Sequence, residues 1–370
     1  MTTPTLIHTT TLAASCFMLM SAATLFGTEI PVSDSKVQIG LSPYNWVYKD
    51  GAISSTVNGA SLVVKFTGTK QVALKVATEQ FKMSVAGRFP IIAWAVNGGT
   101  LQTHQIAANE NSVILSSGVA DPLIDLYIKG MSPFEGRFAG DVPENAVKIT
   151  GFTVDDRGAA TMSRLPAKVW LNIGDSIMSG DGAAYAKGQG RPPDDAWAAS
   201  EDGRASYGYL LANHFGYREA RIAYGGYNWG GGMAQVPALA TLIDQRTSTV
   251  SRLVGDVLNP NPDVVMINLG ENGAPADAAV IKALEKLRRR VKSVTKIVVM
   301  VPVSGKGRAE VTRAFNSYKT SSKDENSFLV DLGPVSFDTC DGQHPTALGH
   351  QAIYKAALSS LDKLVIRNLP

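Results

Sequence analysis

Ser176 ends the tripeptide Gly174-Asp175-Ser176, which directly follows an apolar segment at residues 168–173. A serine at a tight turn from a strand into a helix holds its hydroxyl at the edge of the sheet. The first N–H groups of the helix then point toward whatever that hydroxyl attacks. A nucleophilic serine needs this placement. The tripeptide is equally compatible with an ordinary helix cap, because Asp and Ser both favour that position.

A carboxylate and an imidazole stand three residues apart near the C-terminus, as Asp341 and His344 in the segment DGQHP. Pro345 favours an extended backbone at His344. The spacing allows Asp341 to bind one ring nitrogen while the other faces a nucleophile, so the carboxylate would fix the tautomer and stabilise the imidazolium. The remaining histidines are weaker candidates for a general base because of where they stand along the chain: His8, His104, His214 and His350.

Two further motifs follow apolar segments and could donate hydrogen bonds to a developing oxyanion. The pair Gly225-Gly226 leaves backbone N–H groups uncovered, and Asn272 offers a neutral amide. Each has an ordinary alternative, since glycine and asparagine are both common in tight turns. Four such motifs, at the ends of successive elements and in this order, are hard to explain by turns and caps alone.

The pattern of the second half of the chain predicts the elements that would position these motifs. Apolar strands are predicted at residues 168–173, 219–224, 263–269, 296–303 and 327–332. Helices are predicted at residues 206–215, from about Met233, and at 278–291, 309–318 and 346–365. Five alternations of strand and helix indicate a parallel sheet with helices on both faces, in which ligands bind at the carboxyl ends of the strands.

The first half reads differently, with short strands predicted at residues 61–66, 71–76, 90–96, 112–115 and 123–128. The motif Asn97-Gly98-Gly99 is a good hairpin turn, because glycine supplies positive φ at low cost. We therefore predict an all-β sandwich, or jelly roll, at residues 36–156, a linker at 157–167 and an α/β domain at 168–370.

Residues 1–30 include an uncharged apolar run followed by small residues, which is typical of a signal peptide. A retained anchor and a plain N-terminus are the alternatives, because no Lys or Arg precedes the run. We expect a secreted or periplasmic protein with no stable membrane insertion once the leader is removed.

Composition excludes several classes of protein. The net charge of +3, from 35 basic and 32 acidic residues, does not indicate a nucleic-acid partner. Two cysteines exclude a disulfide framework and a cysteine-rich zinc site. Because zinc-protease, phosphate-loop and dinucleotide motifs are absent from the sequence, we expect neither a metal nor a cofactor.

The ordered motifs Gly174-Asp175-Ser176, Gly226, Gly270-x-Asn272 and Asp341-x-x-His344 resemble those of the SGNH (GDSL-like) hydrolase superfamily. The resemblance covers residues 168–370 and implies a flavodoxin-like α/β/α sandwich with five parallel strands. It implies Ser176 as nucleophile, His344 as general base and Asp341 as the residue that orients it. The oxyanion hole would comprise the N–H groups of Ser176 and Gly226 and the side-chain amide of Asn272.

Two positions depart from the family pattern. The family usually has Asp where this chain has Gly273, which leaves the orientation of Asn272 open, and Ile177 replaces a Leu. A β-sandwich ahead of such a domain is similar in architecture to several secreted carbohydrate esterases. The resemblance therefore implies a serine esterase that removes short acyl groups, most simply O-acetyl, from an oligo- or polysaccharide.

Aromatic residues near the motifs suit a sugar ring, so we take Tyr227, Trp229 and Trp197 as candidate substrate-binding residues. Packing of their loops is the alternative role. Two other functions stay open at this point: a carbohydrate O-acyltransferase with the same triad, and a carbohydrate-binding or adhesion protein in which the β domain carries the function. The oligomeric state is not indicated.

Overall fold

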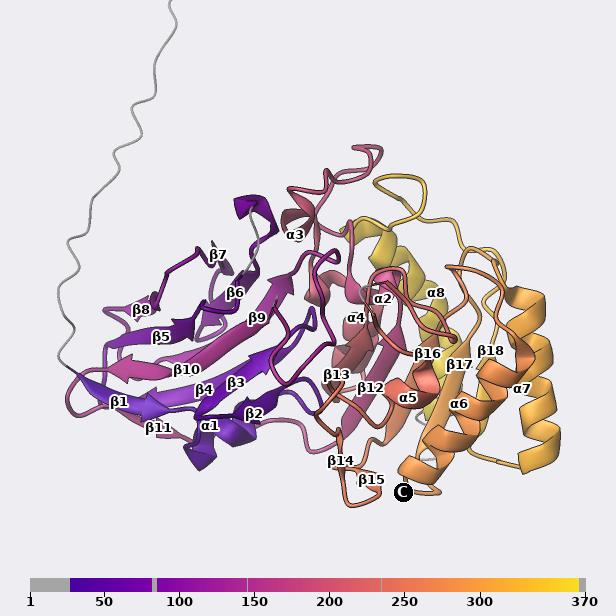
Figure 1. Ribbon diagram of the computed structural model, residues 1–370, viewed down its shortest axis with the longest axis horizontal. Helices are drawn as coiled ribbons and strands as arrows, with labels where there is room; N and C mark the ends of the chain where they lie inside the picture. The colour runs from indigo at the N-terminus through magenta and orange to yellow at the C-terminus, as the bar shows by residue number, and fades with distance from the viewer. Residues whose placement is uncertain (1–26, 82–84, 145, 234, 366–370) are drawn as a thin grey trace, which may run out of the picture.

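The computed structural model describes residues 27–81, 85–144, 146–233 and 235–365, in which a β-rich region packs beside an α/β region (Figure 1). Most of the predicted leader lies outside the described residues. In the part of the chain that is described, no helix is both long and apolar enough to cross a membrane.

The β-rich region is a sandwich of two antiparallel sheets, as predicted. One sheet has the order β2 (Val47–Lys49), β3 (Ala52–Ser55), β10 (Val147–Val154), β5 (Gln71–Ala77), β8 (Ser112–Ser117), and β1 (Thr28–Pro31) also pairs with β10. The other has the order β11 (Ala159–Thr161), β4 (Ser61–Thr67), β9 (Leu123–Gly130), β6 (Ile91–Val96), β7 (Gln102–Gln105). Two short helices, α1 (Ser35–Gly40) and η1 (Ala86–Arg88), complete the region.

Alternation of side chains explains how the two sheets meet. Every second residue of β4 is buried, and Phe66 of β4 packs edge-on against Phe152 of β10 with ring centres 5.1 Å apart. The predicted hairpin turn is confirmed, because Asn97 and Gly98 both have positive φ, of 51° and 70°, between β6 and β7. Primed turns of this kind match the twist of the strands they join.

The sandwich extends beyond the bounds predicted from the sequence. β1 pairs with β10 from Thr28 onward, and β11 lies inside the segment predicted as a linker and pairs with β4. Strands of three or four residues are too short to show a hydrophobic period, so pairing partners far along the chain define them. We therefore propose residues 28–161 as the bounds of this domain.

The α/β region contains one sheet of five parallel strands, which confirms the predicted fold. Its order is β13 (Arg218–Ala223), β12 (Val169–Gly174), β16 (Val264–Asn268), β17 (Lys296–Met300), β18 (Ser327–Val330). The longer helices are α4 (Tyr207–His214), α6 (Asp277–Arg290), α7 (Arg308–Ser322) and α8 (Ala347–Val365). Short elements are α2 (Ser176–Ser179), α3 (Trp197–Ser200), η2 (Gly203–Ala205), α5 (Leu239–Leu242), β14 (Leu253–Val254) and β15 (Val257–Leu258).

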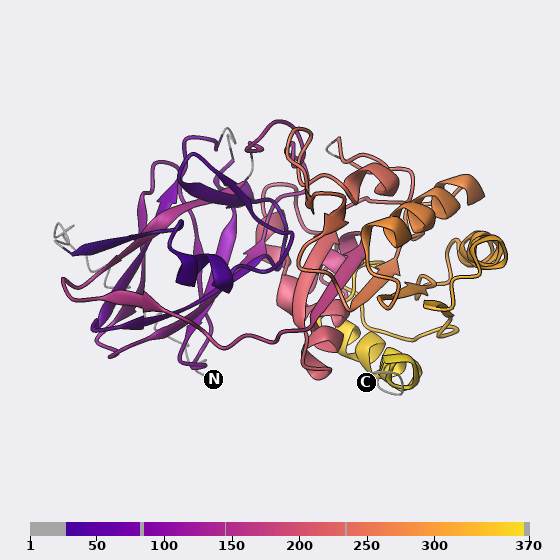
Figure 2. The same cartoon turned by 90° about the horizontal axis from the view of Figure 1, so that it is seen from below.

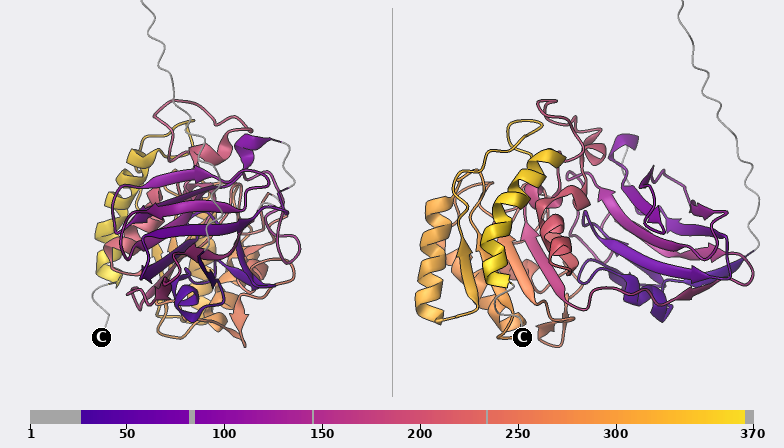
Figure 3. Two further views of the ribbon diagram at one scale, coloured as in Figure 1. Left: turned by 90° about the vertical axis from the view of Figure 1, so that its left-hand side faces the viewer. Right: turned by 180° about the vertical axis from the view of Figure 1, so that it is seen from behind.

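Helices cover both faces of this sheet, with α4 and α8 on one side and α6 and α7 on the other (Figures 2 and 3). Successive residues of β16 serve the two faces in turn. Met266 belongs to the apolar cluster that includes Ile353 of α8, whereas Val265 and Ile267 belong to the cluster that includes Leu284 of α6. All five β16 residues are buried, as expected for a central parallel strand.

One predicted helix is wrong. The helix expected from about Met233 is replaced by the four-residue α5 and then by the hairpin of β14 and β15. Gln235 has a φ of 62°, which a right-handed helix cannot contain, and Pro237 lacks the N–H that a helix interior needs. The hydrophobic residues of this segment therefore pack as a loop.

Buried polar contacts join the two regions. Arg204 of η2 makes two hydrogen bonds with Asp125 of β9, at 2.8 and 2.6 Å, and its guanidinium lies 4.3 Å from the ring centre of Tyr127. Asn45 donates from Nδ2 to the carbonyl of Arg221 in β13 at 2.5 Å. These bonds fix how the sandwich sits against the five-stranded parallel sheet.

Candidate active site

Ser176 lies at the first turn after the central strand β12. Asp175 caps α2, because its side chain accepts a hydrogen bond from the N–H of Ile177 at 3.0 Å. A Cβ on Gly174 would lie 2.3 Å from Cβ of Met178, so only glycine permits this turn. Burial raises the pKa of Asp175 to about 8, so this carboxyl is a neutral cap at pH 7.

His344 faces Ser176 from the loop that precedes α8. Its Nε2 lies 3.1 Å from Oγ of Ser176, and its Nδ1 lies 2.7 Å from Oδ2 of Asp341. The other oxygen of Asp341 accepts the backbone N–H groups of Gln343 and His344, at 3.0 and 2.8 Å. The structure thus joins a hydroxyl, an imidazole and a carboxylate in one hydrogen-bonded chain.

The electrostatics of Asp341 suit a permanently charged partner. Burial would raise the pKa of Asp341, but the hydrogen bonds from the side chain and backbone of His344 outweigh it and lower that pKa below its ordinary value. Asp341 is therefore ionised at neutral pH. An ionised carboxylate on Nδ1 holds the proton there and leaves Nε2 free to accept one from Ser176.

The segment after α2 supports the histidine loop from behind. The N–H of Ala347 donates to the carbonyl of Ala183 at 3.0 Å, and a Cβ on Gly182 would lie 2.8 Å from Cβ of His344. Gly182 also has a φ of 77°. The close approach of these two backbones depends on the absence of a side chain at residue 182.

The proposed oxyanion donors follow the two strands that flank β12. Gly174 is in register with Ala223 of β13 and with Asn268 of β16, so the three strand ends meet at one edge of the sheet. Gly226 comes three residues after β13 with a φ of 66°, and Asn272 comes four residues after β16.

Asn272 is anchored although the usual aspartate is missing. Its Nδ2 donates to the carbonyl of Tyr227 at 3.0 Å, which ties the loop after β16 to the loop after β13 and leaves one amide hydrogen for a ligand. Gly273 has a φ of 127°, a conformation that Asp rarely adopts, and its carbonyl accepts Nδ2 of Asn228 at 2.8 Å. The departure at residue 273 thus comes with a different anchor for Asn272.

Comparison with protein families gives the identity of this site. A family model described as GDSL-like Lipase/Acylhydrolase matches residues 171–357, about half of the chain, and the match includes the serine, the histidine and both proposed donor loops. The chain belongs to the GDSL-like lipase/acylhydrolase family. It is a carboxylic ester hydrolase. A search of curated proteins found no match.

Solved structures show the same two-part fold over almost their whole length. A family two carbohydrate esterase from Cellvibrio japonicus has a TM-score of 0.75 and 15% identity, with 92% of this chain and 98% of that chain covered. The acetyl xylan esterase Est2A from Butyrivibrio proteoclasticus has a TM-score of 0.71 and 17% identity, with 91% and 97% covered. A family two carbohydrate esterase from Clostridium thermocellum, in complex with cellohexaose, has a TM-score of 0.68 and 19% identity, with 87% and 98% covered.

Two of the aromatic residues predicted to bind substrate in this acylhydrolase lie in its core. Tyr227 and Trp229 are both fully buried, so neither offers a face to a sugar ring, and the prediction for them is wrong. Tyr227 donates its hydroxyl to the carbonyl of Pro237 at 3.1 Å, and Trp229 donates Nε1 to the carbonyl of Leu269 at 3.0 Å. The glycines around them let the loop fold back onto the sheet.

Trp197 is also buried, with 5% of its surface exposed, but it lies beside His344, so its binding of substrate stays a prediction. Its ring meets that of His344 edge to face, with centres 6.2 Å apart, and the guanidinium of Arg191 lies 5.3 Å from its ring centre. Its Nε1 is buried without a hydrogen-bond partner. Trp197 thus forms one wall beside the imidazole.

The β-rich region supplies a wall that the sequence did not reveal. Phe134 packs edge-on against Trp197 at 5.4 Å, and Arg88 lies 5.2 Å from the ring centre of Phe134. Pro133 comes within 3.1 Å of where a Cβ on Gly225 would lie. One feature of the sequence could have pointed to this wall. The connection after β9 is long and contains Pro and Gly, and long connections without regular structure are often functional.

The other described histidines have ordinary structural roles. His350 is fully buried, and burial lowers its pKa to about 3, while Nδ1 faces the N–H of Tyr207 at 3.3 Å. His214 is exposed and hydrogen-bonds Tyr354 at 3.0 Å, and His104 pairs with Glu110 at 2.8 Å.

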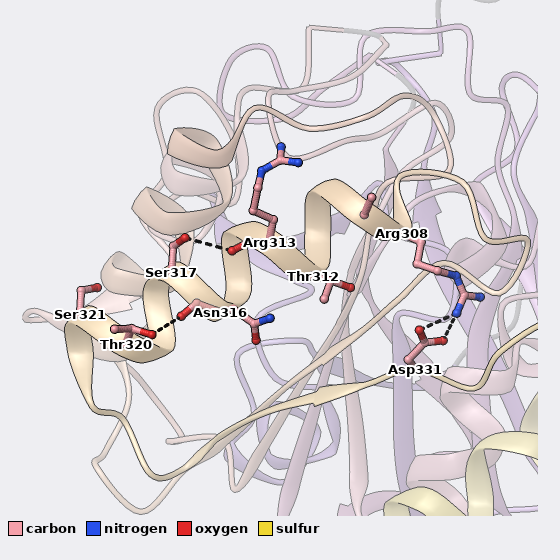
Figure 4. A pocket seen from close by; sticks show the side chains of 9 residues that line it. Arg308, Thr312, Arg313, Asn316, Ser317, Thr320, Ser321 and Asp331 are labelled. Atoms are coloured by element: carbon pink, nitrogen blue, oxygen red, sulfur yellow. Dashed lines mark hydrogen bonds and ion pairs between the residues drawn. The ribbon is translucent and has the colours of Figure 1, made fainter.

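A shallow cavity of about 850 Å³ lies elsewhere, along the outer face of α7 (Figure 4). Its charged residues are already paired, Arg308 with Asp331 and Arg313 with Asp277. Two of its hydroxyls, on Ser317 and Thr320, donate to carbonyls of their own helix. No histidine or cysteine is among the residues that line this cavity, so none of its hydroxyls has an imidazole beside it as a base. Among the described residues, no group of three or more His, Cys, Asp or Glu side chains could hold a metal ion.

Proposed function

We propose that this hydrolase is a serine esterase that removes short acyl groups, most simply O-acetyl, from a carbohydrate. The observation that carries the proposal is the hydrogen-bonded chain from Ser176 through His344 to Asp341, with contacts of 3.1 and 2.7 Å. In this proposal Ser176 is the nucleophile, His344 the general base and Asp341 the carboxylate that fixes the tautomer.

The reaction has two acyl-transfer steps. Nε2 of His344 takes the proton from Ser176 while Oγ attacks the ester carbonyl carbon. The oxyanion is held by the N–H groups of Ser176 and Gly226 and by the amide of Asn272, and each such donor is worth ~10²–10³ in kcat. The bond to the sugar oxygen then breaks, and that oxygen receives the proton from His344. Water, deprotonated by the same base, attacks the acyl-serine and releases the acid.

The immediate surroundings support a short acyl group. Ser176 is only 3% exposed, so little space surrounds its hydroxyl, which favours a small acyl group over a long chain. Outward from His344, Trp197 contacts the imidazole, and Phe134 and Arg191 contact Trp197. Arg88 lies over Phe134 and pairs with Glu135. Aromatic faces flanked by charged groups suit a sugar, which has apolar C–H faces and hydroxyl edges.

The structural neighbours support the carbohydrate class. Three proteins described as carbohydrate esterases or as an acetyl xylan esterase share the fold of both regions of this chain. The sandwich that they share supplies Phe134 in this chain, which contacts Trp197 beside His344. We therefore propose an acetylated oligo- or polysaccharide as the substrate.

The test compares the wild type with Ser176→Ala on 4-nitrophenyl esters of increasing chain length and on acetylated glycans, with Ser317→Ala on α7 as the matched control. We expect Ser176→Ala to lower kcat by ~10⁴-fold or more, because the nucleophile is lost, and Ser317→Ala to change nothing. A preference for acyl chains of eight or more carbons would overturn the substrate class. Activity that survives in Ser176→Ala would overturn the mechanism and return the function to the β domain.

Acyl transfer to a sugar is distinguished in the same assay. An acyl-serine can react with a sugar hydroxyl instead of water, with all other steps unchanged. Product analysis with an added acceptor glycan separates free acetate from transferred acetate.

A further inference from the structure

A second pair of carboxyl groups lies behind the histidine loop. Asp181 and Glu201 are 1% and 0% exposed, although acidic side chains are rarely buried. Asp181 comes two residues after α2, and its N–H donates to the carbonyl of Ser176 at 3.0 Å. Glu201 follows α3, the helix that begins at Trp197. Both carboxyls are thus attached to segments that carry proposed active-site residues.

The hydrogen bonds of the pair locate a proton. Oε2 of Glu201 accepts two donors from the β-rich region, Nδ2 of Asn58 and the N–H of Met131, each at 2.6 Å. Oε1 of Glu201 and Oδ1 of Asp181 are buried without any donor, although the two carboxyls lie within hydrogen-bonding reach of each other. Two ionised carboxylates in this position would repel, so one shared proton satisfies both orphaned oxygens.

The proton belongs to Glu201. Burial raises the pKa of Glu201 well above its usual value, and the charge of Asp181 raises it further. Burial also raises the pKa of Asp181, but His344, Arg137 and the hydrogen bond from Glu201 all act to lower it. With a single proton, Glu201 is neutral at Oε1 and Asp181 carries the negative charge.

Other charged and titratable groups face this pair from each neighbouring element. They are His344, Arg137, Lys129, Asp175 and Cys340. Asp175 is a neutral cap at pH 7, and burial raises the pKa of the Cys340 thiol to about 11, so both are uncharged. Arg137 is buried and donates to the carbonyls of Ser132 and Met131, and Lys129 donates to the carbonyl of Glu201. Among these neighbours, His344 has the largest effect on the charge of Asp181.

We propose that Asp181 is a second positioning carboxylate for His344, and that Glu201 serves it by holding the shared proton. As His344 takes the proton from Ser176, the imidazolium that forms is bonded to Asp341 at Nδ1. Asp181 acts on it through space, from the residue next to Gly182, where a Cβ would lie 2.8 Å from Cβ of His344. The charge of Asp181 favours the imidazolium and so lowers the barrier to acyl transfer. This inference rests on the proposed function, because it assumes that His344 is the base.

In this inference the sandwich contributes to catalysis in a second way, in addition to the contact of Phe134 with Trp197. Asn58 and Met131 both donate to Oε2, which commits the proton to the oxygen that faces Asp181. Asn58 donates as well to Oγ of Ser179 in α2, at 2.9 Å. Both donors lower the pKa of Glu201, but burial and the charge of Asp181 outweigh them, so the β-rich region determines which oxygen of Glu201 carries the proton.

Conservative variants separate the two roles. In Glu201→Gln the amide can replace the proton as donor to Asp181, so the charge stays beside His344, and we expect kcat within about threefold of the wild type. In Asp181→Asn the amide donates to Glu201 instead, so the charge moves away from His344. We expect kcat to fall by about 10-fold or more with KM little changed, and the acid limb of the kcat/KM profile to move to lower pH. Asp277→Asn, at an exposed pair with Arg313, is the matched control.

Two further measurements keep the inference testable. Titration of Ser176 with an organophosphate reagent counts folded sites, so rates are compared per competent enzyme. Infrared difference spectroscopy at pH 7 should detect protonated carboxyl bands from Asp175 and Glu201, of which Glu201→Gln removes one, Asp175→Asn removes the other and Asp341→Asn removes neither. Equal losses of kcat in Asp181→Asn and Glu201→Gln, an unmoved acid limb in Asp181→Asn, or the absence of the Glu201 band would each overturn the inference. Wild-type hydrolysis that does not depend on Ser176 would instead overturn the proposed function.

Discussion

Asp341 uses both of its oxygens to hold His344, one on the ring and one on the backbone N–H groups of the same loop. Neighbouring residues show the same double use: Asp175 caps the helix that carries Ser176, and Asn272 binds the carbonyl of Tyr227 while one amide hydrogen stays free. At the scale of single residues, the proposed chemistry depends on side chains that are held in one orientation by a hydrogen bond to a neighbouring group.

Asp341→Asn tests this orientation. Asn can present an N–H to Nδ1 and so favour the wrong tautomer, with Nε2 protonated and unable to take a proton from Ser176. We expect kcat to fall by ~10⁴-fold with little change in KM, as for such a change in other triads. Steady-state kinetics on 4-nitrophenyl acetate measures it. A loss below tenfold would show that Asp341 does not set the tautomer.

Asp175 predicts how the stability of the whole chain depends on pH. Its folded pKa of about 8 lies above the unfolded value of about 3.9, so between these values the folded state binds more protons than the unfolded state. The free energy of unfolding should therefore decrease as pH rises from 5 to 8, by up to about 1.4 kcal/mol per pH unit for this one group. Asp175→Asn keeps a good cap and should flatten that slope in urea titrations. An unchanged slope would contradict the assignment of a neutral Asp175.

At the scale of elements, the site is made by strand ends and by loops that brace one another. β12 presents Ser176, its two neighbours present the donor loops, and the segment after α2 packs against the histidine loop through Gly182. The regular elements set the positions to within a residue or two. Contacts between the loops then set the distances between the catalytic groups, which have to be correct to within about 1 Å.

Two glycine variants test the contact between Gly182 and the loop that carries His344. Gly182 and Gly188 both have positive φ, of 77° and 69°, but only a Cβ on Gly182 would meet His344 and Cys340. Each Gly→Ala change should cost about 1–2 kcal/mol of stability through the backbone. We expect Gly182→Ala also to lower kcat by ~10²-fold because His344 is displaced, while Gly188→Ala keeps full activity. Similar activities of the two variants would contradict the role of this contact.

At the scale of the whole molecule, the sandwich contributes side chains that contact the proposed active site. It places Phe134 against Trp197 and fixes Glu201 through Asn58 and Met131, and Arg204 with Asp125 holds the two regions together. In the proposed function a substrate bound at Ser176 would touch both regions, because the aromatic contacts beside His344 continue from Trp197 onto Phe134.

Phe134→Ala measures the contribution of that wall to substrate choice. Loss of the ring should lower kcat/KM on an acetylated glycan by about 10-fold through KM, because a sugar face loses its partner, and should leave 4-nitrophenyl acetate almost unaffected. Met162→Ala, which changes an exposed residue next to β11, is the control. Equal effects on both substrates would mean that Phe134 acts through His344 rather than on the sugar.

The sequence by itself determined the two-part architecture, the five parallel strands and the order of the motifs at their ends. These features follow from local patterns: apolar runs that form buried strands, and glycines that allow the turn at Ser176. It also singled out Asp341 and His344, because their spacing of three residues is a local property. The roles proposed for them need the experiments above.

Only the tertiary structure decided what depends on residues distant along the chain. It placed Tyr227 and Trp229 in the core, replaced the helix expected from Met233 by a loop, and brought Phe134 of the sandwich to the wall of the site. It also paired Asp181 with Glu201. Burial and hydrogen-bond partners are set by segments that meet only after folding, so no local pattern around these residues carries that information.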